Sequence, residues 1–308
     1  MEYVRYCINC GAKKVYKNLD SFRANKNSLL CRRCARTKLW QEKYPNKIEK
    51  LLEDTPEAYY WIGYLLADGH FNDNNRIKFT QNNEDKPSVE RFKNFVESVC
   101  DVKYTNISDD TDCASFSIMN VDVVPKIIDK FDIKSSKTYC PPNLKIFEDM
   151  DIDLLAYLFI GFVDGDGHIA NLHNRPDFNI RIKLHSSWLN VLKIFETRLF
   201  GITGHTKIDK EGYAVFMFGD SQILKEFKKK YILNIGFEPL KRKWDIINLD
   251  YVGKYEQSKI RFQKVKELYE QGCSVKDICE KLNLKEGLVY KNLRKIRGLS
   301  KRGPKRKE

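Results

Sequence analysis

Two stretches of the sequence decide the fold, WIGYLLADGHF at residues 61–71 and FIGFVDGDGHI at residues 159–169. Each is an apolar run that ends in Asp-Gly-His, and the two aspartates are Asp68 and Asp166. Neither run has a polar face, and a helix of this kind is covered by protein on all sides. The sequence therefore predicts two buried helices, each of which ends in an aspartate.

The same two predicted helices contain small residues four positions apart. Gly63 and Ala67 lie on one side of the first helix, and Gly161 and Gly165 lie on one side of the second. Because residues i and i+4 share a helix face, each helix has a strip without bulky side chains. We expect the helices to pack face to face along these strips, with their C-terminal ends side by side.

A glycine follows each aspartate, Gly69 in the first copy and Gly167 in the second, and we expect each to form a left-handed C-cap. Helix C-termini carry exposed carbonyl oxygens and partial negative charge, which favour a cation. Carboxylate and carbonyl oxygens are the hard ligands that Mg²⁺ prefers. The sequence therefore predicts one magnesium site formed by Asp68, Asp166 and the backbone of Gly69 and Gly167.

The segments that follow the two helices repeat one order of elements. Thr55 and Pro56 suit the N-cap and first position of a helix over 56–68, and Asp153 is expected to cap the second helix. In the first copy we also expect strands at 76–81 and 114–119 and helices at 87–100 and 121–131. In the second copy we expect a strand at 179–186, a helix at 187–200, a hairpin at 203–218 and a helix at 220–231. The sequence thus contains two copies of one α/β unit.

The predicted strands at 76–81 and 179–186 alternate between apolar and polar residues, so each has one face on the core and one open face. The polar residues of the open faces are Arg76, Lys78 and Thr80 in the first copy, and Asn179, Arg181, Lys183 and His185 in the second. A solvated surface would explain such faces. Because these side chains also suit contacts with base edges, we expect them to bind DNA.

The charge of the chain is concentrated at its two ends. The formal net charge is +13, with +9 in residues 1–50, −6 in residues 51–253 and +10 in residues 254–308. Two basic ends favour a polyanionic partner, since each neutralised phosphate releases counterions, although a solvated basic surface has the same composition. We expect a zinc module with a basic linker at 1–50, one repeat at 51–150, a second repeat at 151–253, and a DNA-binding module with a basic tail at 254–308.

Four cysteines near the start of the chain, Cys7, Cys10, Cys31 and Cys34, form two C-x2-C pairs. Each two-residue gap lets both sulfurs face one ion, and four thiolates give the tetrahedral site that Zn²⁺ prefers. Two disulfides are the alternative, which a reducing cytosol disfavours. We therefore expect a structural zinc ion.

From residue 259 onward the sequence has the pattern of three short helices. Ser274, with Asp277 three residues later, suits a capping box. The segment resembles the helix-turn-helix modules of recombinases and regulators, with residues 285–297 as the recognition helix. The side chains expected in the major groove are Tyr290, Lys291, Arg294 and Arg297. A generic three-helix bundle is the alternative.

Residues 61–69 and 159–167 resemble the LAGLIDADG motif of homing endonucleases, and their pairing in one chain resembles the single-chain members of that family. The likeness spans about residues 55–250. The family's metal-binding aspartate comes directly before the final glycine, and it falls on Asp68 and Asp166.

An earlier acidic position of the motif departs from the family pattern, because it is Asp164 in the second copy but Leu66 in the first. The resemblance implies an α+β fold, a saddle with pseudo-two-fold symmetry built from two αββαββα-like repeats, with its sheets lining the major groove. It also implies Mg²⁺-dependent hydrolysis of both DNA strands.

The resemblance further implies one lysine near each scissile phosphate, late in each repeat. In the first repeat this lysine falls on Lys137, with Lys134 as its rival, and in the second it falls on Lys243, with Lys241 as its rival. His70 and His168, which follow the two Asp-Gly pairs, suit contact with water or phosphate; a packed or exposed imidazole fits them equally well.

We therefore expect a monomeric, site-specific double-strand DNA endonuclease that uses Mg²⁺ at a long asymmetric target. The alternatives are a DNA-binding transcription regulator on the same scaffold and a maturase that binds intron RNA. The longest apolar run, residues 154–163, is too short to span a bilayer. Since the first residues also lack a signal peptide, we expect a cytoplasmic protein of bacterial, phage or organellar origin.

Overall fold

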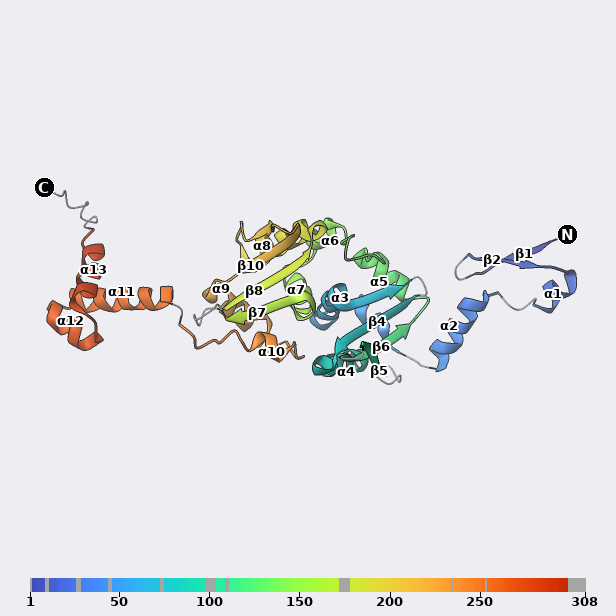
Figure 1. Ribbon diagram of the computed structural model, residues 1–308, viewed down its shortest axis with the longest axis horizontal. Coiled ribbons are helices and arrows are strands. Elements are labelled where there is room, and N and C mark those ends of the chain that lie inside the picture. Colours follow the sequence, from blue (N-terminus) through green and yellow to red (C-terminus); the bar gives the residue numbers. More distant parts are fainter. Residues whose placement is uncertain are drawn as a thin grey trace. The chain divides into compact units, whose positions relative to one another are not determined.

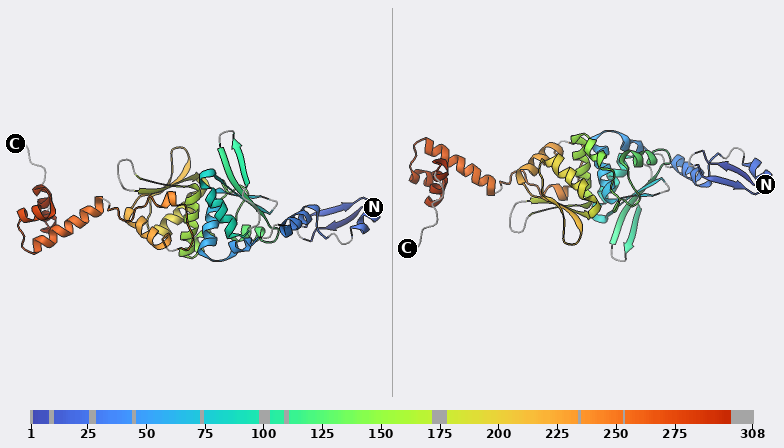
Figure 2. Two further views of the ribbon diagram at one scale, coloured as in Figure 1. Left: turned by 90° about the horizontal axis from the view of Figure 1, so that it is seen from below. Right: turned by 90° about the horizontal axis from the view of Figure 1, so that it is seen from above.

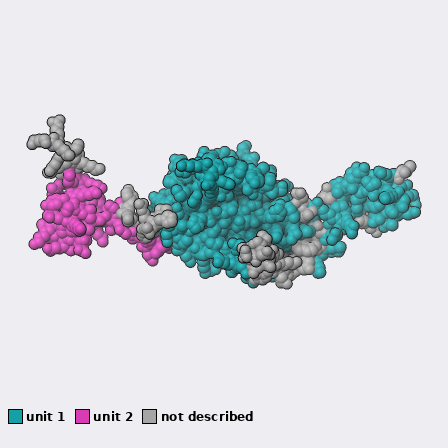
Figure 3. Space-filling view, viewed as in Figure 1, with its two compact units in different colours: residues 1–247 teal, residues 248–308 magenta. Residues whose placement is uncertain are grey.

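Figure 1 shows the computed structural model of the chain. It describes residues 2–8, 11–25, 29–43, 46–72, 75–97, 103–108, 111–171, 178–233, 235–252 and 254–298. The chain divides into two compact units, residues 1–247 and residues 248–308 (Figure 3). Among the helices in the described ranges, none is both long enough and apolar enough to cross a bilayer.

The first unit begins with a small module. Its elements are the antiparallel strands β1 (Tyr3–Tyr6) and β2 (Lys13–Tyr16) and the helices α1 (Leu19–Ala24) and α2 (Arg32–Lys43). Asn18 caps α1, because its side chain accepts a hydrogen bond of 2.8 Å from the Ser21 amide. A short 3-10 helix, η1 (Ile48–Leu52), precedes the repeats.

The rest of the first unit consists of two repeats with the same order of elements (Figure 1). The first contains α3 (Pro56–Asp68), β3 (Gly69–Asn72), β4 (Arg76–Asn82), α4 (Lys86–Phe95), β5 (Lys103–Ser108), β6 (Thr111–Met119) and α5 (Val124–Phe131). The second contains α7 (Ile152–Asp166), β7 (Gly167–Asn171), β8 (Phe178–His185), α8 (Leu189–Phe200), β9 (Thr206–Ile208), β10 (Tyr213–Phe218) and α9 (Ser221–Tyr231). Shorter elements are η2 (Asn83–Asp85) and η3 (Ser186–Trp188), which follow β4 and β8, and the helices α6 (Leu144–Asp149) and α10 (Lys241–Trp244). The predicted α+β duplication, with an αββαββα order in each copy, is confirmed.

Each repeat has one four-stranded antiparallel sheet, with strand orders β3-β4-β6-β5 and β7-β8-β10-β9. The helices of the repeats lie on one side of the sheets (Figure 2). The alternation expected for β4 and β8 is confirmed, because Ile77, Phe79, Ile180 and Ile182 are fully buried. The strands β3 and β7 were not predicted, since four or five residues directly after a helix are too few to show a period of two.

Helices α3 and α7 pack against each other with their backbones in contact. A Cβ atom added to Gly63 would lie 1.9 Å from the carbonyl oxygen of Leu158, and one added to Gly161 would lie 1.9 Å from that of Tyr60. Residues 58–67 of α3 are buried, as are residues 158–164 of α7. The predicted face-to-face packing along the small residues is therefore confirmed.

The start of α3 agrees with the sequence prediction, and the start of α7 does not. Thr55 caps α3 and accepts a hydrogen bond from the Ala58 amide. Asp151 caps α7, so the prediction that Asp153 does so is wrong. The Asp153 side chain lies in the first turn and pairs with Lys230 at 2.9 Å.

The glycines that follow the two helices are extended rather than left-handed, with φ of −72° at Gly69 and −85° at Gly167. The predicted left-handed C-cap is therefore wrong, because the chain runs directly from each helix into β3 or β7. A side chain is excluded for a steric reason instead. An added Cβ atom would lie 2.5 Å from the carbonyl oxygen of Leu65 in the first copy and 2.6 Å from that of Val163 in the second.

In the second unit, residues 254–298 form three helices, α11 (Lys254–Glu270), α12 (Val275–Leu282) and α13 (Glu286–Ile296). Ser274 and Asp277 form the expected capping box at the start of α12. Its core consists of Val265, Ile278, Val289 and Leu293, with Leu268, Val275, Leu282 and Ile296 packed around them. Residues 299–308, which include the predicted basic tail KRGPKRKE at 301–308, lie outside the described residues.

Candidate active site at the ends of the paired helices

Asp68 is the last residue of α3, and its side chain is half-buried. One of its carboxylate oxygens accepts a hydrogen bond of 2.7 Å from the side-chain amide of Gln81 on β4. Burial raises the pKa of Asp68, although the Gln81 bond and the nearby ammonium groups of Lys137 and Lys243 act in the opposite direction. The carboxylate is thus fixed in orientation, and its ionised form would be stabilised by a further cation.

Asp166 occupies the equivalent position at the end of α7. Its side chain reaches solvent, but the packed helix ends remove water from much of its surroundings. This loss of hydration, followed by repulsion from Asp68, raises the pKa of Asp166 to about 6. The two helix ends meet closely, because a Cβ atom added to Gly165 would lie 3.1 Å from a carboxylate oxygen of Asp68.

This pair of carboxylates suits a divalent cation. Asp68 and Asp166 come from separate repeats, repel each other, and both resist ionisation in the protein alone. A hard cation between them would remove that repulsion, and carboxylate oxygens are the ligands that Mg²⁺ prefers. The residues present therefore fit the predicted ion.

Lys137 lies at the C-terminal end of α3. Its ammonium group donates to the carbonyl oxygen of Leu66 at 2.8 Å and to that of Ala67. Burial lowers the pKa of Lys137, while the charges of Asp166 and Asp68 raise it. Exposed carbonyls at a helix end carry partial negative charge, which explains why a buried ammonium is tolerated there.

Lys243, on α10, occupies the same place at the end of α7 and is 7% exposed. Its ammonium group donates to the carbonyl oxygens of residues 163, 164, 165 and 167, at 2.6 to 3.1 Å. Burial lowers its pKa as well. The Gly167 carbonyl, predicted as a magnesium ligand, thus accepts a hydrogen bond from Lys243, and the Gly69 amide donates to the Leu65 carbonyl.

The rival lysines lie on the surface. Lys134 is exposed and pairs with Asp132, and Lys241 is exposed and pairs with Glu238 at 2.9 Å. The structure thus brings Lys137 and Lys243, rather than their rivals, to the two aspartates.

His70 and His168 are exposed on β3 and β7, where they pair across the sheet with Lys78 and Arg181, respectively. Both histidines therefore lie next to the polar strand faces. This position suits contact with solvent or with a phosphate group.

The predicted polar strand faces differ between the repeats. In the first repeat, Arg76 donates to the Ser117 hydroxyl at 2.8 Å, and Lys78 and Thr80 are half-buried. In the second, Asn179 is half-buried and Arg181 is exposed. The remaining two residues of that face have neighbours within the repeat: Lys183 pairs with Asp209 and Glu211, and His185 caps η3.

A cavity of about 430 Å³ opens beside Asp166. Its lining includes Lys137 from the first repeat and Lys183, His185, Trp188 and Tyr213 from the second. The cavity thus connects the candidate catalytic residues to the polar strand face of the second repeat.

Gln81 was not predicted as a site residue, although its place in the strand pattern is a signal for it. Gln81 follows Ile77 and Phe79 on the apolar side of β4, so it is a polar residue at a position where the alternation predicts an apolar one. In the second repeat the equivalent residue is Leu184, since Gly69 pairs with Phe79 and Gly167 pairs with Ile182. Asp166 therefore lacks the amide partner that Asp68 has.

Asp164 is a second residue whose role was underestimated. Its buried carboxylate accepts hydrogen bonds from the Tyr60 hydroxyl at 2.9 Å, the Leu240 amide at 2.8 Å and the Trp244 indole at 2.8 Å. Burial raises the pKa of Asp164 to about 6 despite these bonds. Asp164 thus joins α7 to α3 and to the α10 segment that carries Lys243, which Leu66 cannot do in the first copy.

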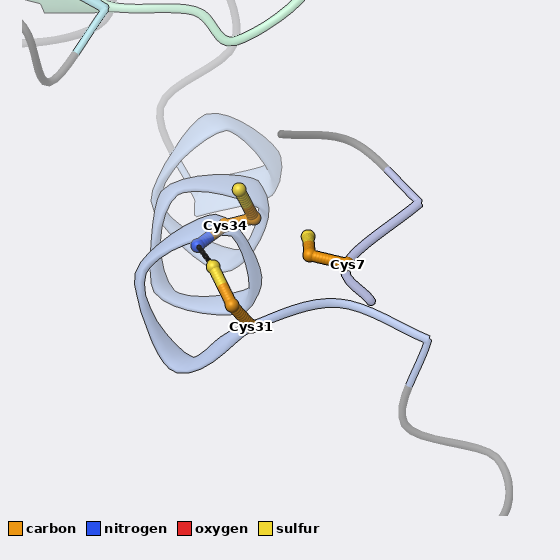
Figure 4. Close-up of side chains that lie close together, drawn as sticks. All are labelled: Cys7, Cys31 and Cys34. Carbon is orange, nitrogen blue, oxygen red and sulfur yellow. Dashed lines mark hydrogen bonds between the residues drawn. The ribbon is translucent and has the colours of Figure 1, made fainter. Parts of the chain in front are cut away.

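The sulfur atoms of Cys7, Cys31 and Cys34 lie within 4.8 Å of one another in the N-terminal module (Figure 4). Cys10, the fourth predicted zinc ligand, lies outside the described residues. Cys7 and Cys34 are buried, and the Cys34 amide donates to the Cys31 sulfur at 3.4 Å. Three convergent cysteine sulfurs form a donor set that fits Zn²⁺.

The predicted recognition helix corresponds to α13. Tyr290 and Lys291 are exposed, and Arg294 is half-buried. Arg297 is exposed, but its guanidinium lies 5.0 Å from the centre of the Tyr269 ring and donates to the Tyr269 hydroxyl. The three helices therefore display a polar, cationic surface on α13.

Comparisons with known proteins give structural likenesses alone. No protein-family model matches the chain, and no curated protein is similar to it in sequence. In structure it is similar to the I-LtrWI LAGLIDADG homing endonuclease bound to target DNA, with 13% identity over 82% of this chain and 96% of that chain and a TM-score of 0.40. The LAGLIDADG homing endonuclease I-GzeII in complex with its DNA target shows 13% identity over 80% and 99%, with a TM-score of 0.39. Meganuclease I-SmaMI bound to uncleaveable DNA shows 13% identity over 78% and 95%, with a TM-score of 0.41.

Proposed function

We propose that the chain is a site-specific DNA endonuclease that hydrolyses both strands of its target with a divalent metal ion. The observation that supports this proposal most directly is the pairing of Asp68 and Asp166 at two abutting helix ends, each of which also holds a lysine. If the two helices served only for packing, two like charges at their contact would destabilise the fold without a compensating benefit.

Asp68 and Asp166 would hold Mg²⁺, which when bound supplies Lewis acidity toward water and the phosphate group. Gln81 keeps the carboxylate of Asp68 in one orientation. Lys137 and Lys243 place fixed positive charge at the helix ends, where it stabilises the charge that develops on a phosphate during hydrolysis.

Three surfaces would bind the DNA. The strand faces with Arg76 and Arg181 belong to β4 and β8, which pair with the strands β3 and β7 that begin directly after the two aspartates. The N-terminal module, with zinc, and the helix-turn-helix module, with α13, carry the basic ends of the chain and would add phosphate contacts. The protein would act as a monomer, because both halves of the site come from one chain.

Selection from a library of randomised DNA duplexes tests the proposal. We expect the purified protein to cut both strands at one fixed offset when Mg²⁺ is added, and to bind without cutting in EDTA. Sequence-specific binding without cutting under Mg²⁺ or Mn²⁺ would instead support the regulator, and preference for folded intron RNA over duplex DNA would support the maturase.

Removal of zinc should weaken DNA binding without moving the cut. A strong chelator, or Cys34→Ser, is expected to unfold the N-terminal module and to lower affinity by about tenfold, because several phosphate contacts are lost. Zinc content, affinity and cut position would be measured together. Cys140→Ser is the control, since Cys140 is an exposed free cysteine and its loss should leave one zinc ion bound. A change in the cut position after zinc removal would contradict this separation of roles.

A further inference from the structure

Each lysine of the candidate site lies on a short segment that the opposite repeat contacts. The lysine segments are residues 134–140, which follow α5 in the first repeat, and residues 240–244, which follow α9 in the second. The ammonium groups bind the helix of their own repeat, as described above. η3 of the second repeat binds the backbone of the first segment, and η2 of the first repeat binds a side chain of the second segment.

Trp188, the last residue of η3, contacts the first lysine segment. Its indole Nε1–H donates to the carbonyl oxygen of Lys137 at 3.0 Å and to that of Thr138 at 3.2 Å. Trp188 is 2% exposed, and its ring centre lies 5.3 Å from that of Phe162 on α7. A rigid, buried donor from the second repeat therefore fixes the backbone of Lys137.

Asp85, the last residue of η2, contacts the second lysine segment through a side chain of that segment. Its carboxylate accepts two hydrogen bonds from the guanidinium of Arg242, one of them 2.9 Å long from Nε. Asp85 is 7% exposed, and Arg242 directly precedes Lys243. Asp85 and Trp188 occupy equivalent positions in the two repeats. Asp85 lies six residues after Phe79, which pairs with Gly69, and Trp188 lies six residues after Ile182, which pairs with Gly167.

Each lysine segment is connected to the aspartate of the other repeat. In the first case Lys137, Trp188 and Asp166 line the same cavity. In the second case the connection runs through the end of β4 and η2, because Gln81 binds Asp68, and Asp85, four residues later, binds Arg242. Each half of the site thus combines a lysine segment from one repeat with an aspartate from the other.

We propose that Trp188 and the Asp85–Arg242 pair are positioning residues that set the two lysines independently, so that the cut in each DNA strand depends on a different one of them. The proposal rests on the endonuclease function proposed above. It assigns the strand at Asp166 to Trp188 and Lys137, and the strand at Asp68 to Asp85, Arg242 and Lys243.

The two halves should not be equally sensitive. The second lysine segment is also held by Asp164, which binds the Leu240 amide and the Trp244 indole. In the first repeat the position equivalent to Asp164 is Leu66, whose side chain cannot form such hydrogen bonds with the first lysine segment. Loss of the Trp188 donor should therefore slow cleavage of the DNA strand at Asp166 more than loss of the Asp85 charge slows cleavage of the DNA strand at Asp68.

The experiment follows each strand separately with duplexes labelled at one end of one strand. Trp188→Phe keeps most of the ring and removes only the donor; it is expected to slow one cut about tenfold and to accumulate nicked DNA. Asp85→Asn is expected to slow the other cut about threefold. Trp61→Phe is the matched control, because Trp61 is equally buried and packs on Phe79 and Phe92; both cuts should keep their rates.

A second measurement needs neither DNA nor metal. Acetic anhydride labelling of the folded protein, read by mass spectrometry, should modify Lys137 about threefold faster in Trp188→Phe and Lys243 faster in Asp85→Asn, because local opening becomes easier. Equal slowing of both strands by each variant, or unchanged lysine labelling, would overturn the positioning roles. A wild-type protein that binds but never cuts would overturn the endonuclease function, while the labelling would still decide whether the contacts position the lysines.

Discussion

Asp68→Asn and Asp166→Asn should each lower double-strand cleavage by at least about 10³-fold, because either change removes one of the two carboxylates that would hold the metal ion. Asparagine has nearly the same shape, so the packing of α3 against α7 is kept. Affinity for the target in EDTA should stay within about threefold, since one negative charge fewer does not weaken contact with phosphates.

Single-turnover cleavage on a duplex containing the selected target, with filter or gel-shift binding in parallel, measures both effects. Asp153→Asn is the control, because Asp153 is an exposed acid in the first turn of the same helix as Asp166. It should cut at the wild-type rate. Wild-type rates for both aspartate variants would show that the helix ends are not the catalytic site.

The same variants should change the stability of the metal-free protein in a defined pH range. The pKa of Asp166 is about 6 in the folded protein and 3.8 in the unfolded chain, so its ionisation opposes folding as the pH rises through 6. Asp166→Asn should therefore be more stable than wild type at pH 7. The gain should be only about 1 kcal/mol because the side chain still reaches water, and it should vanish below about pH 4. Added Mg²⁺ should reverse the order by stabilising wild type alone.

Gly161→Ala should destabilise the first unit by more than about 3 kcal/mol, which is near the limit for a single added methyl group. The new Cβ atom would lie 1.9 Å from the carbonyl oxygen of Tyr60, and backbone atoms of a packed helix cannot move aside as a flexible side chain can. The helix seam must therefore separate, or the unit must unfold.

Urea unfolding followed by circular dichroism measures this loss. Gly287→Ala is the matched control, because Gly287 also lies in a helix but an added Cβ atom would meet nothing within 4 Å. That variant should be neutral or more stable by about 0.5–1 kcal/mol, as expected for alanine in place of glycine in a helix. If Gly161→Ala unfolded at the wild-type urea concentration, the close backbone contact between α3 and α7 would be wrong.

The sequence was sufficient for the parts of the fold that depend on local pattern. The small residues at Gly63 and Gly161 predicted the helix seam, and the alternation around Ile77 and Ile180 predicted the strands and their buried faces. The capping box at Ser274 predicted the start of α12. Each of these patterns involves residues within one or two turns of one another, so it can be recognised without knowledge of the rest of the fold. The seam itself joins distant helices, and it could be predicted because the same local pattern occurs twice.

The remaining features depend on contacts between distant segments, which a single sequence does not contain. The conformation of Gly69 was predicted incorrectly, because a left-handed cap and a direct entry into a strand both require glycine. The contact between Trp188 and Lys137 joins residues 51 positions apart, and that between Asp85 and Arg242 joins residues 157 positions apart. Such pairs become visible only when the two repeats are placed together.

The seam between α3 and α7 has one more consequence if the chain cuts DNA. At Gly63 and Gly161 backbone contacts backbone, so at these points no side chain can change rotamer and let the two helices shift. The spacing between Asp68 and Asp166 is then constant, and the DNA duplex must change its shape to fit it. Base steps at the centre of a target that bend or narrow easily would be cut faster than stiff ones, even where no side chain touches them.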